Sequence, residues 1–141
     1  MADYELVDLS VGMSCEREYH FTEERVKQFA LLVNDHAPVH VDSDFASRQG
    51  YAGRIVHGLF VQSIISGMLG NDLPGPKSVI NTINMKMHNP VLLGQTVDYK
   101  LEISAITKAV AAVLLSFSGT TDGSLVISGK SLCSFPVSSS S

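Results

Sequence analysis

One apolar stretch, residues 55–70 with the sequence IVHGLFVQSIISGMLG, constrains the fold more than any other part of the chain. Its apolar side chains fall on nearly every face of a helix, which is typical of a helix enclosed by other segments. About 14 residues of helix span roughly 21 Å, which is too short to cross a bilayer. We therefore predict a central helix wrapped by the rest of the chain. Gly70 followed by Asn71 favours a left-handed end for this helix.

The chain after Lys77 changes from a helical to a strand-like apolar period. Asp122-Gly123 is a strong hairpin signal, whereas Pro90 and Gly94 interrupt the pattern. One long helix before a run of antiparallel strands predicts an α+β fold in which a curved sheet wraps that helix. Strands are predicted within residues 77–88, 97–105, 109–119 and 124–135, with 109–119 near the centre of the sheet because it is the most hydrophobic.

The N-terminal half predicts two further helices. Thr22 is a good N-cap, and the apolar residues of 23–34 recur with helical spacing, so this segment predicts an amphipathic helix. Pro38 prevents the helix from continuing. Asp42 or Ser43 then suits the N-cap of a second, short helix.

The composition indicates a single globular domain, which we place at residues 1–137, followed by a serine tail at 138–141 that we expect to be disordered. Apolar residues make up 45% of the chain and charged residues 17%. This is slightly more apolar than usual and suggests an additional buried surface such as a subunit interface. The net charge of -4, with no basic patch, argues against a nucleic-acid partner.

The N-terminal residues include acids and no long apolar run, so we predict neither a signal peptide nor a membrane span. Cys15 and Cys133 fit no metal-ligand spacing. We expect both to be reduced thiols of a cytoplasmic protein.

The segment between the two N-terminal helices, residues 34–42, carries candidate catalytic groups. Asp35 and His40 are five residues apart with Pro38 between them, so the chain can fold their side chains toward one water molecule. The alternative is that Asp35 caps a turn and His40 is an ordinary loop histidine. His36 and His40 have the spacing of a helical zinc motif, but Pro38 should break the helix that this motif needs. We therefore expect no metal site.

A second cluster lies at the start of the central helix. Gly58 offers an unobstructed backbone N–H at the positive end of the helix dipole, where a carbonyl oxygen gaining negative charge can bind. The alternative is that Gly58 is a spacer, His57 a cap-region side chain and Ser66 a packing residue. Neither Ser63 nor Ser66 lies in a Gly-x-Ser-x-Gly arrangement, which disfavours a serine-nucleophile hydrolase.

Together, in this order, the motifs resemble those of the MaoC-like hot dog enzymes. Within that family the sequence is most similar to the short, single-domain (R)-specific enoyl-CoA hydratases, over roughly residues 8–136. The motifs that carry the resemblance are Asp35-x-x-Pro38-x-His40-x-Asp42, Ile55-x-His57-Gly58, Ser66-Gly67-x-Leu69-Gly70 with Leu73-Pro74-Gly75, and Asn89-Pro90-Val91-x-x-Gly94.

The resemblance implies a hot dog fold, a homodimer, and Asp35 and His40 as the catalytic pair. The pair would deprotonate a water that adds to C3 of a trans-2-enoyl thioester, and a proton would reach C2. Gly58 would polarise the thioester carbonyl, so Gly58, Ser66 and His57 are the expected substrate-binding residues. The substrate is carried on CoA or acyl carrier protein, and no metal or redox cofactor is implied.

One departure from the family pattern is Ala37, where the family usually has an asparagine. The missing amide could loosen the loop that carries Asp35, and it leaves activity and substrate open. Asn34 could take its place.

Three alternatives to a CoA-dependent hydratase remain open. A dehydratase acting on acyl carrier protein would need a basic rim for its acidic partner. A hot dog thioesterase would need a carboxylate placed for attack at C1. A non-catalytic acyl-thioester-binding module is disfavoured because both Asp35 and His40 are present. Candidates for the basic rim are Arg48, Arg54, Lys77 and Lys86.

Overall fold

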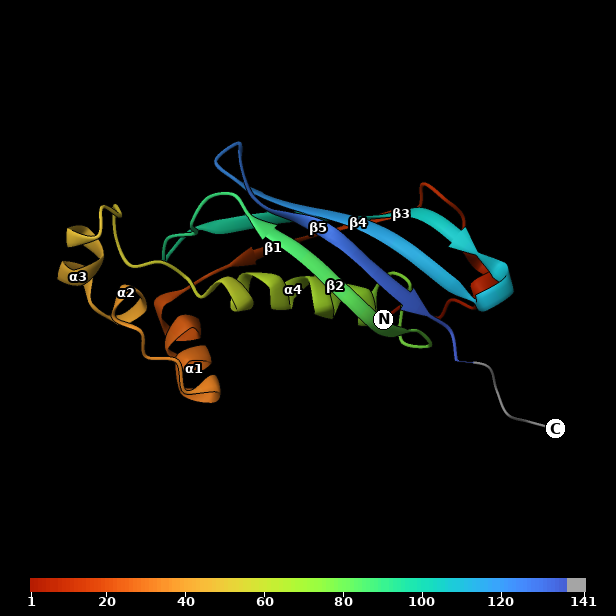
Figure 1. Ribbon diagram of the computed structural model, residues 1–141, viewed down its shortest axis with the longest axis horizontal. Coiled ribbons are helices and arrows are strands. Elements are labelled where there is room, and N and C mark those ends of the chain that lie inside the picture. The colour runs from red at the N-terminus through yellow and green to blue at the C-terminus, as the bar shows by residue number, and fades with distance from the viewer. Residues whose placement is uncertain (137–141) are drawn as a thin grey trace.

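The structure, a computed structural model, describes residues 1–136. Val137, the last residue of the predicted domain, and the predicted serine tail at 138–141 lie outside the described residues. Figure 1 shows the elements in space. In chain order they are the 3-10 turn η1 (Leu6–Asp8), β1 (Ser14–His20), α1 (Glu23–Val33), α2 (Pro38–Val41), α3 (Ser43–Arg48), α4 (Gly58–Asn71), β2 (Val79–Met87), β3 (Thr96–Thr107), the 3-10 turn η2 (Lys108–Val110), β4 (Ala112–Thr121) and β5 (Ser124–Ser134).

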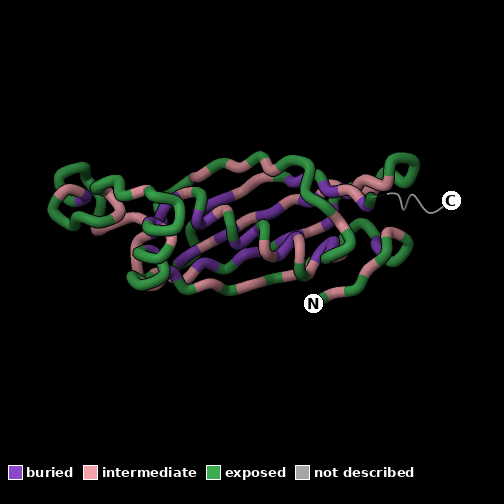
Figure 2. The backbone as a smooth tube through the Cα atoms, turned by 90° about the horizontal axis from the view of Figure 1, so that it is seen from below, coloured by how far each residue is buried: buried purple, intermediate pink, exposed green. Residues whose placement is uncertain are grey.

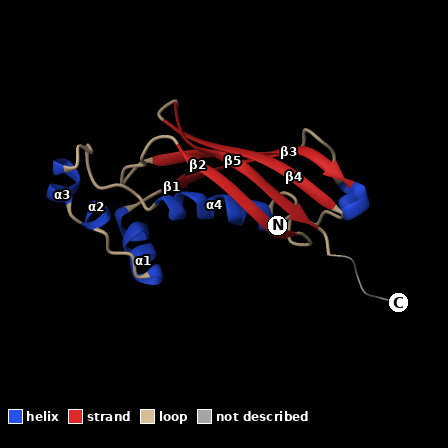
Figure 3. Cartoon of the chain, in the orientation of Figure 1, coloured by secondary structure: helices blue, strands red, loops and turns tan. Residues whose placement is uncertain are grey.

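The five strands form one antiparallel sheet in the order β1-β3-β4-β5-β2. Helix α4 lies along one face of this sheet, and α1, α2 and α3 gather at the end where α4 begins (Figures 1 and 3). The prediction of an α+β fold, with a curved sheet around a central helix, is therefore confirmed. The predicted central strand is also correct, because β4 is the middle strand of the sheet.

The core lies between α4 and the inner face of the sheet (Figure 2). The burial of these apolar side chains is the main contribution to the stability of the fold. One polar contact crosses the core, because the fully buried Tyr99 of β3 donates its hydroxyl hydrogen to the carbonyl oxygen of Val61 at 2.7 Å. The buried residues of α4 are Phe60, Val61, Ile64, Ile65, Met68 and Leu69.

Helix α4 is not enclosed on every face, so that part of the prediction is wrong. Leu59 is 67% exposed, and Ser63 and Ser66 are also exposed. Because residues three, four and seven apart share one side of a helix, these three form an open face of α4. The sheet covers only the opposite side of the helix, and the described chain has no second layer over the open face (Figure 3).

The predicted left-handed end of α4 at Gly70 and Asn71 is also wrong. The helix continues through Asn71, and Asp72 keeps a right-handed conformation while its N–H bonds to the carbonyl of Met68. The Asp72 carboxylate pairs with Arg17 of β1 at 2.9 Å, which ties this end of the helix to the sheet edge. The chain reverses later, at Gly75, where φ is +101°.

The two predicted helices of the N-terminal half are confirmed as α1 and α3, whereas the short helix α2, in the segment predicted to be a loop between them, was not predicted. Thr22 caps α1 by accepting a hydrogen bond from the Arg25 N–H. Pro38 opens α2 rather than interrupting a helix, and Asp42 caps α3 through its carboxylate. Within residues 1–136, no helix is long and apolar enough to span a membrane.

We predict that Tyr99→Phe lowers the free energy of unfolding by about 1 kcal/mol, because it removes a buried hydrogen bond while keeping the ring. Urea unfolding of the two proteins measures the difference. Tyr51→Phe is the matched control, since Tyr51 lies on an exposed loop, and it should change stability by less than about 0.5 kcal/mol. An equal change in the free energy of unfolding for both substitutions would contradict the proposed contribution of the Tyr99 hydrogen bond to stability.

Candidate active site

The lead into α4 is held by a short antiparallel contact with the connection between β2 and β3. The Val56 N–H donates to the Val91 carbonyl at 2.7 Å, and the Leu93 N–H donates to the Arg54 carbonyl at 3.1 Å. Ile55 and Leu92 form the bridge between these two bonds. The predicted strand break at Pro90 and Gly94 therefore supplies the segment that fixes the start of α4.

Asp35 is fixed by its backbone and by its side chain. It follows Asn34, whose left-handed conformation (φ 55°) ends α1. The Asp35 N–H donates to the carbonyl of Ala30 at 2.9 Å, and its Oδ1 accepts the Ala37 N–H at 3.1 Å. The half-buried carboxylate thus caps a turn, as the alternative interpretation expected, while its other oxygen has no such contact among residues 1–136.

His40 lies on α2 and is held by the lead into α4. Its Nδ1 is 2.7 Å from the carbonyl oxygen of Ile55. Because a carbonyl oxygen can only accept, Nδ1 must carry the hydrogen. In the neutral ring Nε2 is then the lone-pair nitrogen, and that is the atom available to take a proton.

His57 is the most enclosed of the candidate residues, with 3% of its surface exposed. Its Nε2 donates to the backbone carbonyl of Asp35 at 3.0 Å. Its ring stacks on the ring of His40, with centroids 3.8 Å apart and planes 23° apart, and contacts Phe29 with centroids 5.0 Å apart. Its Nδ1 is buried and has no hydrogen-bond partner within residues 1–136.

Burial lowers the pKa of His57 below its usual 6.5. The neighbouring imidazoles of His40 and His36 act in the same direction, whereas the bond to the Asp35 carbonyl and the Asp35 carboxylate oppose it. His57 is therefore a neutral ring near neutral pH, which suits its close stacking on His40.

The side chains of Asp35, His40 and His57 converge. A carboxylate oxygen and one ring nitrogen of each histidine all lie within 4.8 Å of one another. The structure thus brings together Asp35 and His40, as the sequence spacing predicts, and adds His57. The arrangement suits a proton-transfer pair better than a metal site, because nearly parallel stacked rings direct their lone pairs side by side rather than toward one ion.

The other two predicted substrate-binding residues lie on α4. Gly58 is its first residue and is half-buried, and the N–H groups of a first helical turn have no acceptor within the helix. Ser66 lies eight residues further, about 12 Å along the axis. Within residues 1–136 Ser66 makes no hydrogen bond to Asp35 or His40, so the structure does not bring it into the cluster.

A family model for the MaoC like domain matches residues 9–115. The chain belongs to the MaoC-like family. It is 31% identical over 129 residues to an (R)-specific enoyl-CoA hydratase of Aeromonas caviae, across 91% of this chain and 96% of that protein. It is 30% identical over 129 residues to a 3-hydroxybutyryl-CoA dehydratase of Methylorubrum extorquens, across 92% of this chain and 82% of that protein.

The fold of this MaoC-like domain matches that of a solved relative. An (R)-hydratase from A. caviae that is involved in PHA biosynthesis has a TM-score of 0.86 and 30% identity, over 91% of this chain and 98% of that chain. The predicted hot dog fold is therefore confirmed. The prediction of an enzyme in the hydratase and dehydratase class of lyases is also confirmed, because the family and these relatives agree on it.

A hollow of about 340 Å³ in this MaoC-like domain reaches one member of the cluster, His40. His36 and His40 line it together with the apolar side chains of Val26, Leu31 and Leu93. The charged side chains of Glu23, Lys27 and Arg54 also line it, so polar and apolar residues contribute equally to its wall. The hollow lies between α1, α2 and the connection that holds the start of α4.

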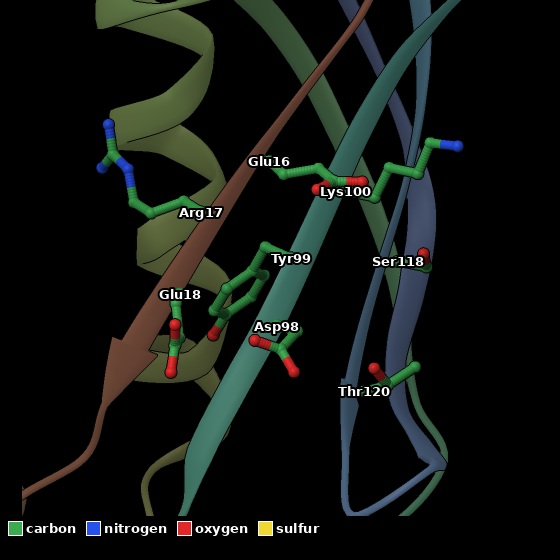
Figure 4. A pocket seen from close by; sticks show the side chains of 8 residues that line it. All are labelled: Glu16, Arg17, Glu18, Asp98, Tyr99, Lys100, Ser118 and Thr120. Atoms are coloured by element: carbon green, nitrogen blue, oxygen red, sulfur yellow. The ribbon is translucent and has the colours of Figure 1, made fainter.

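A second hollow, of about 510 Å³, lies on the sheet across β1, β3 and β4. In Figure 4 the side chains of Arg17 and Tyr99 point toward α4, whereas those of Glu16 and Lys100 point to the other side of the sheet. None of the converging catalytic candidates lines this hollow. The candidate site is therefore chosen by its arrangement of titratable groups rather than by the size of the hollow.

Two contacts in the cluster have no direct signal in the sequence. The Ile55 carbonyl that holds His40 is a backbone group, and every residue carries one. Phe29, which packs against His57, follows the ordinary apolar period of α1. Only the position of Ile55 next to the His57-Gly58 motif could have pointed to a local role.

We predict that the stability of the domain falls below pH 6.5, in part because of His57. The unfolded chain takes up a proton at this ring near pH 6.5 while the folded chain leaves it neutral, so stability is full above that pH and is lost as the pH falls toward the lower folded-state pKa. The slope from this one group is at most about 1.4 kcal/mol per pH unit.

Urea unfolding of the wild type and His57→Gln, at about pH 7.5 and about pH 5.5, tests this expectation. Glutamine does not titrate, so the stability difference between the two proteins should narrow at the lower pH. The shared contributions of other histidines cancel in this comparison. A difference that stays constant or widens would contradict the lowered pKa.

Proposed function

We propose that this domain catalyses the (R)-specific hydration of trans-2-enoyl-CoA to (R)-3-hydroxyacyl-CoA, or the reverse dehydration. The observation that carries the proposal is the convergence of the Asp35 carboxylate and the His40 ring, within 4.8 Å, beside the start of α4. The names of the two relatives, an (R)-specific enoyl-CoA hydratase and a 3-hydroxybutyryl-CoA dehydratase, support it.

The proposed chemistry is a proton transfer within the pair. A water molecule held between Asp35 and His40 loses a proton to the pair as its oxygen bonds to C3 of the enoyl thioester. The pair then returns a proton to C2, so it ends in its starting state. His40 suits the role of base because the Ile55 carbonyl engages Nδ1 and leaves Nε2 with the lone pair.

The electrons displaced from the double bond accumulate on the thioester carbonyl. We propose that the Gly58 N–H, at the positive end of α4, donates to that oxygen and stabilises its developing charge. This scheme requires no metal and no redox cofactor, since only protons and water are exchanged. CoA enters as the carrier of the substrate.

Ser66 remains a proposed substrate contact at a greater distance. It is seven residues from Leu59 and therefore shares the same open face of α4. An acyl chain whose thioester lies at Gly58 could extend along that face. Ala37 does not remove the Asp35 turn, because its backbone N–H still binds Oδ1.

The names of the two relatives favour CoA over acyl carrier protein as the substrate carrier, and the basic residues give no clear site for an acidic partner protein. Two of the four candidate basic residues are occupied by carboxylates, since Arg54 pairs with Glu23 and Lys77 pairs with Asp3 and Glu5. A rim that is partly neutralised attracts an acidic partner protein less strongly. An acyl-carrier-protein dehydratase is therefore the second candidate, and a thioesterase or a non-catalytic acyl-thioester-binding module ranks below it.

We also propose a homodimer in the cytoplasm. The open face of α4 and the unpaired outer edges of β1 and β2 are surfaces that a second copy could cover. Cys15 and Cys133 are both free thiols, which agrees with a reducing compartment.

We expect crotonyl-CoA to lose its enoyl-thioester absorbance in the presence of the protein without release of free thiol. Asp35→Asn and His40→Ala should each reduce the rate by at least about 100-fold, because each removes a proton-transfer group. The amide introduced by Asp35→Asn keeps an oxygen that can accept the Ala37 N–H, so the turn is retained. Thermal unfolding of each variant checks that the fold is intact.

The outcomes of this assay separate the candidates. Thiol release would favour a thioesterase, and activity only on a crotonyl carrier protein would favour the second candidate. No turnover of either thioester would favour the non-catalytic module. Near-normal activity in either variant would remove the proposed mechanism.

We predict that Gly58→Ala folds normally but lowers the rate by about tenfold or more, because a methyl group beside the N–H obstructs the approach of the carbonyl. A Cβ at position 58 would meet Met87 Cγ at 3.7 Å, an ordinary contact, so the fold can accept it. Gly70→Ala, on the same helix with open space around a new Cβ, is the control and should retain full activity. Equal rates for both variants would exclude the proposed role of Gly58.

A further inference from the structure

We infer that His57 is a positioning residue for the catalytic pair rather than a substrate-binding residue. It contacts the backbone of Asp35 and the ring of His40, and it directly precedes Gly58. The His57 side chain thus links Asp35, His40 and Gly58, the three residues to which we assign the reaction. This inference rests on the proposed function of Asp35 and His40, and it adds a role that the sequence motif did not separate from binding.

The burial of His57 excludes direct contact with a substrate. Only 3% of the residue is exposed, and Nδ1, the ring nitrogen without a partner in residues 1–136, is itself buried. The ring lies between His40, at 3.8 Å, and Phe29, at 5.0 Å. A group enclosed in this way acts on the reaction through its neighbours.

The bond from His57 to the Asp35 carbonyl completes the fixation of that residue. The Asp35 N–H is held by the Ala30 carbonyl at 2.9 Å, and its carbonyl is held by His57 Nε2 at 3.0 Å. With both peptide groups bonded, the loop cannot rotate the Cα–Cβ direction of Asp35 freely. The direction of its carboxylate follows from that restraint and from the bond to the Ala37 N–H.

Stacking on the His57 ring restricts the rotation of the His40 ring that its hydrogen bond still allows. A single hydrogen bond from Nδ1 to the Ile55 carbonyl sets one edge of the His40 ring but allows the ring to rotate about the line of the bond. The His57 face, with planes only 23° apart, opposes that rotation. Nε2 of His40 is therefore aimed by two contacts, and one of them is His57.

Two substitutions separate the contacts that His57 makes. His57→Phe keeps an aromatic face for His40 but removes the donor to the Asp35 carbonyl. His57→Gln keeps a donor but removes the ring. If His57 positions the pair, each variant should lower kcat for crotonyl-CoA by about tenfold or more and change KM by less than about threefold, since the binding surface is untouched.

A double-mutant cycle then tests whether His57 acts through His40. In a His40→Ala background, the additional change His57→Gln, which removes the ring that stacks on His40 but keeps a donor to Asp35, should cost less than about threefold in kcat, because the group that this ring orients is already absent. A merely structural role would lower stability in both backgrounds and would not produce this pattern. His20→Gln is the control, since His20 also bonds a backbone carbonyl, that of Gly94, but is exposed and should have normal kcat.

Imidazole nitrogen NMR provides a readout that does not depend on turnover. In the wild type, His40 should carry its hydrogen on Nδ1 and His57 on Nε2. In His57→Gln, which removes the stacked ring, the His40 signals should shift toward a mixture of tautomers, whereas His57→Phe should leave them close to those of the wild type. If the wild type hydrates no enoyl thioester, the proposed function fails, and these spectra still decide whether His57 orders His40. A kcat within about threefold of wild type in both variants, a multiplicative loss in the cycle, or unchanged His40 signals in His57→Gln would overturn the inference.

Discussion

The candidate site depends on the short antiparallel contact between residues 54–56 and 91–93. This contact leaves both backbone groups of Ile55 directed away from the 91–93 segment, and both are used on α2. The Ile55 N–H donates to the Val39 carbonyl at 3.1 Å, and the Ile55 carbonyl accepts Nδ1 of His40 at 2.7 Å. Ile55 therefore joins the 91–93 segment, which lies between β2 and β3, to α2. The residues that follow Ile55 form the start of α4. The position of the candidate catalytic groups relative to the α4 N-terminus follows from backbone hydrogen bonds, which any residue except proline at position 55 would allow.

Periodicity predicted the fold because local sequence and tertiary packing agree over most of the chain. The apolar residues of α4 and the alternation of β3 both match the core that they form. The prediction failed where a distant contact decides the outcome. Asp72 keeps a right-handed conformation and pairs its carboxylate with Arg17 of β1, a distant contact that no pattern near Gly70 contains. The open face of α4 was missed because an apolar period indicates burial without indicating what covers each side.

The candidate site was predictable only in part for the same reason. Asp35 and His40 are close in sequence, so their spacing and Pro38 were sufficient to suggest that they meet. The contact of His57 with the Asp35 carbonyl spans 22 residues and involves a backbone acceptor. The stacking of His40 on His57 likewise could not be predicted, because the separation of the two histidines in the sequence matches neither a helical nor a strand period. The sequence thus predicts the fold and the Asp35–His40 pair, but it does not predict the contacts of His57 with that pair.

The glycines of the domain separate requirements of the fold from requirements of the chemistry. A Cβ at Gly129 would overlap the carbonyl oxygen of Asn84, and a Cβ at Gly119 would lie 2.8 Å from Ile127, so the packing of the sheet explains both glycines. A Cβ at Gly58 would meet only an ordinary contact, and φ is not positive there. Alanine would also favour the helix at that position. Because nothing in the described residues requires a glycine at the first residue of α4, the packing of the domain does not account for Gly58, and the role proposed for its N–H is separable from the fold.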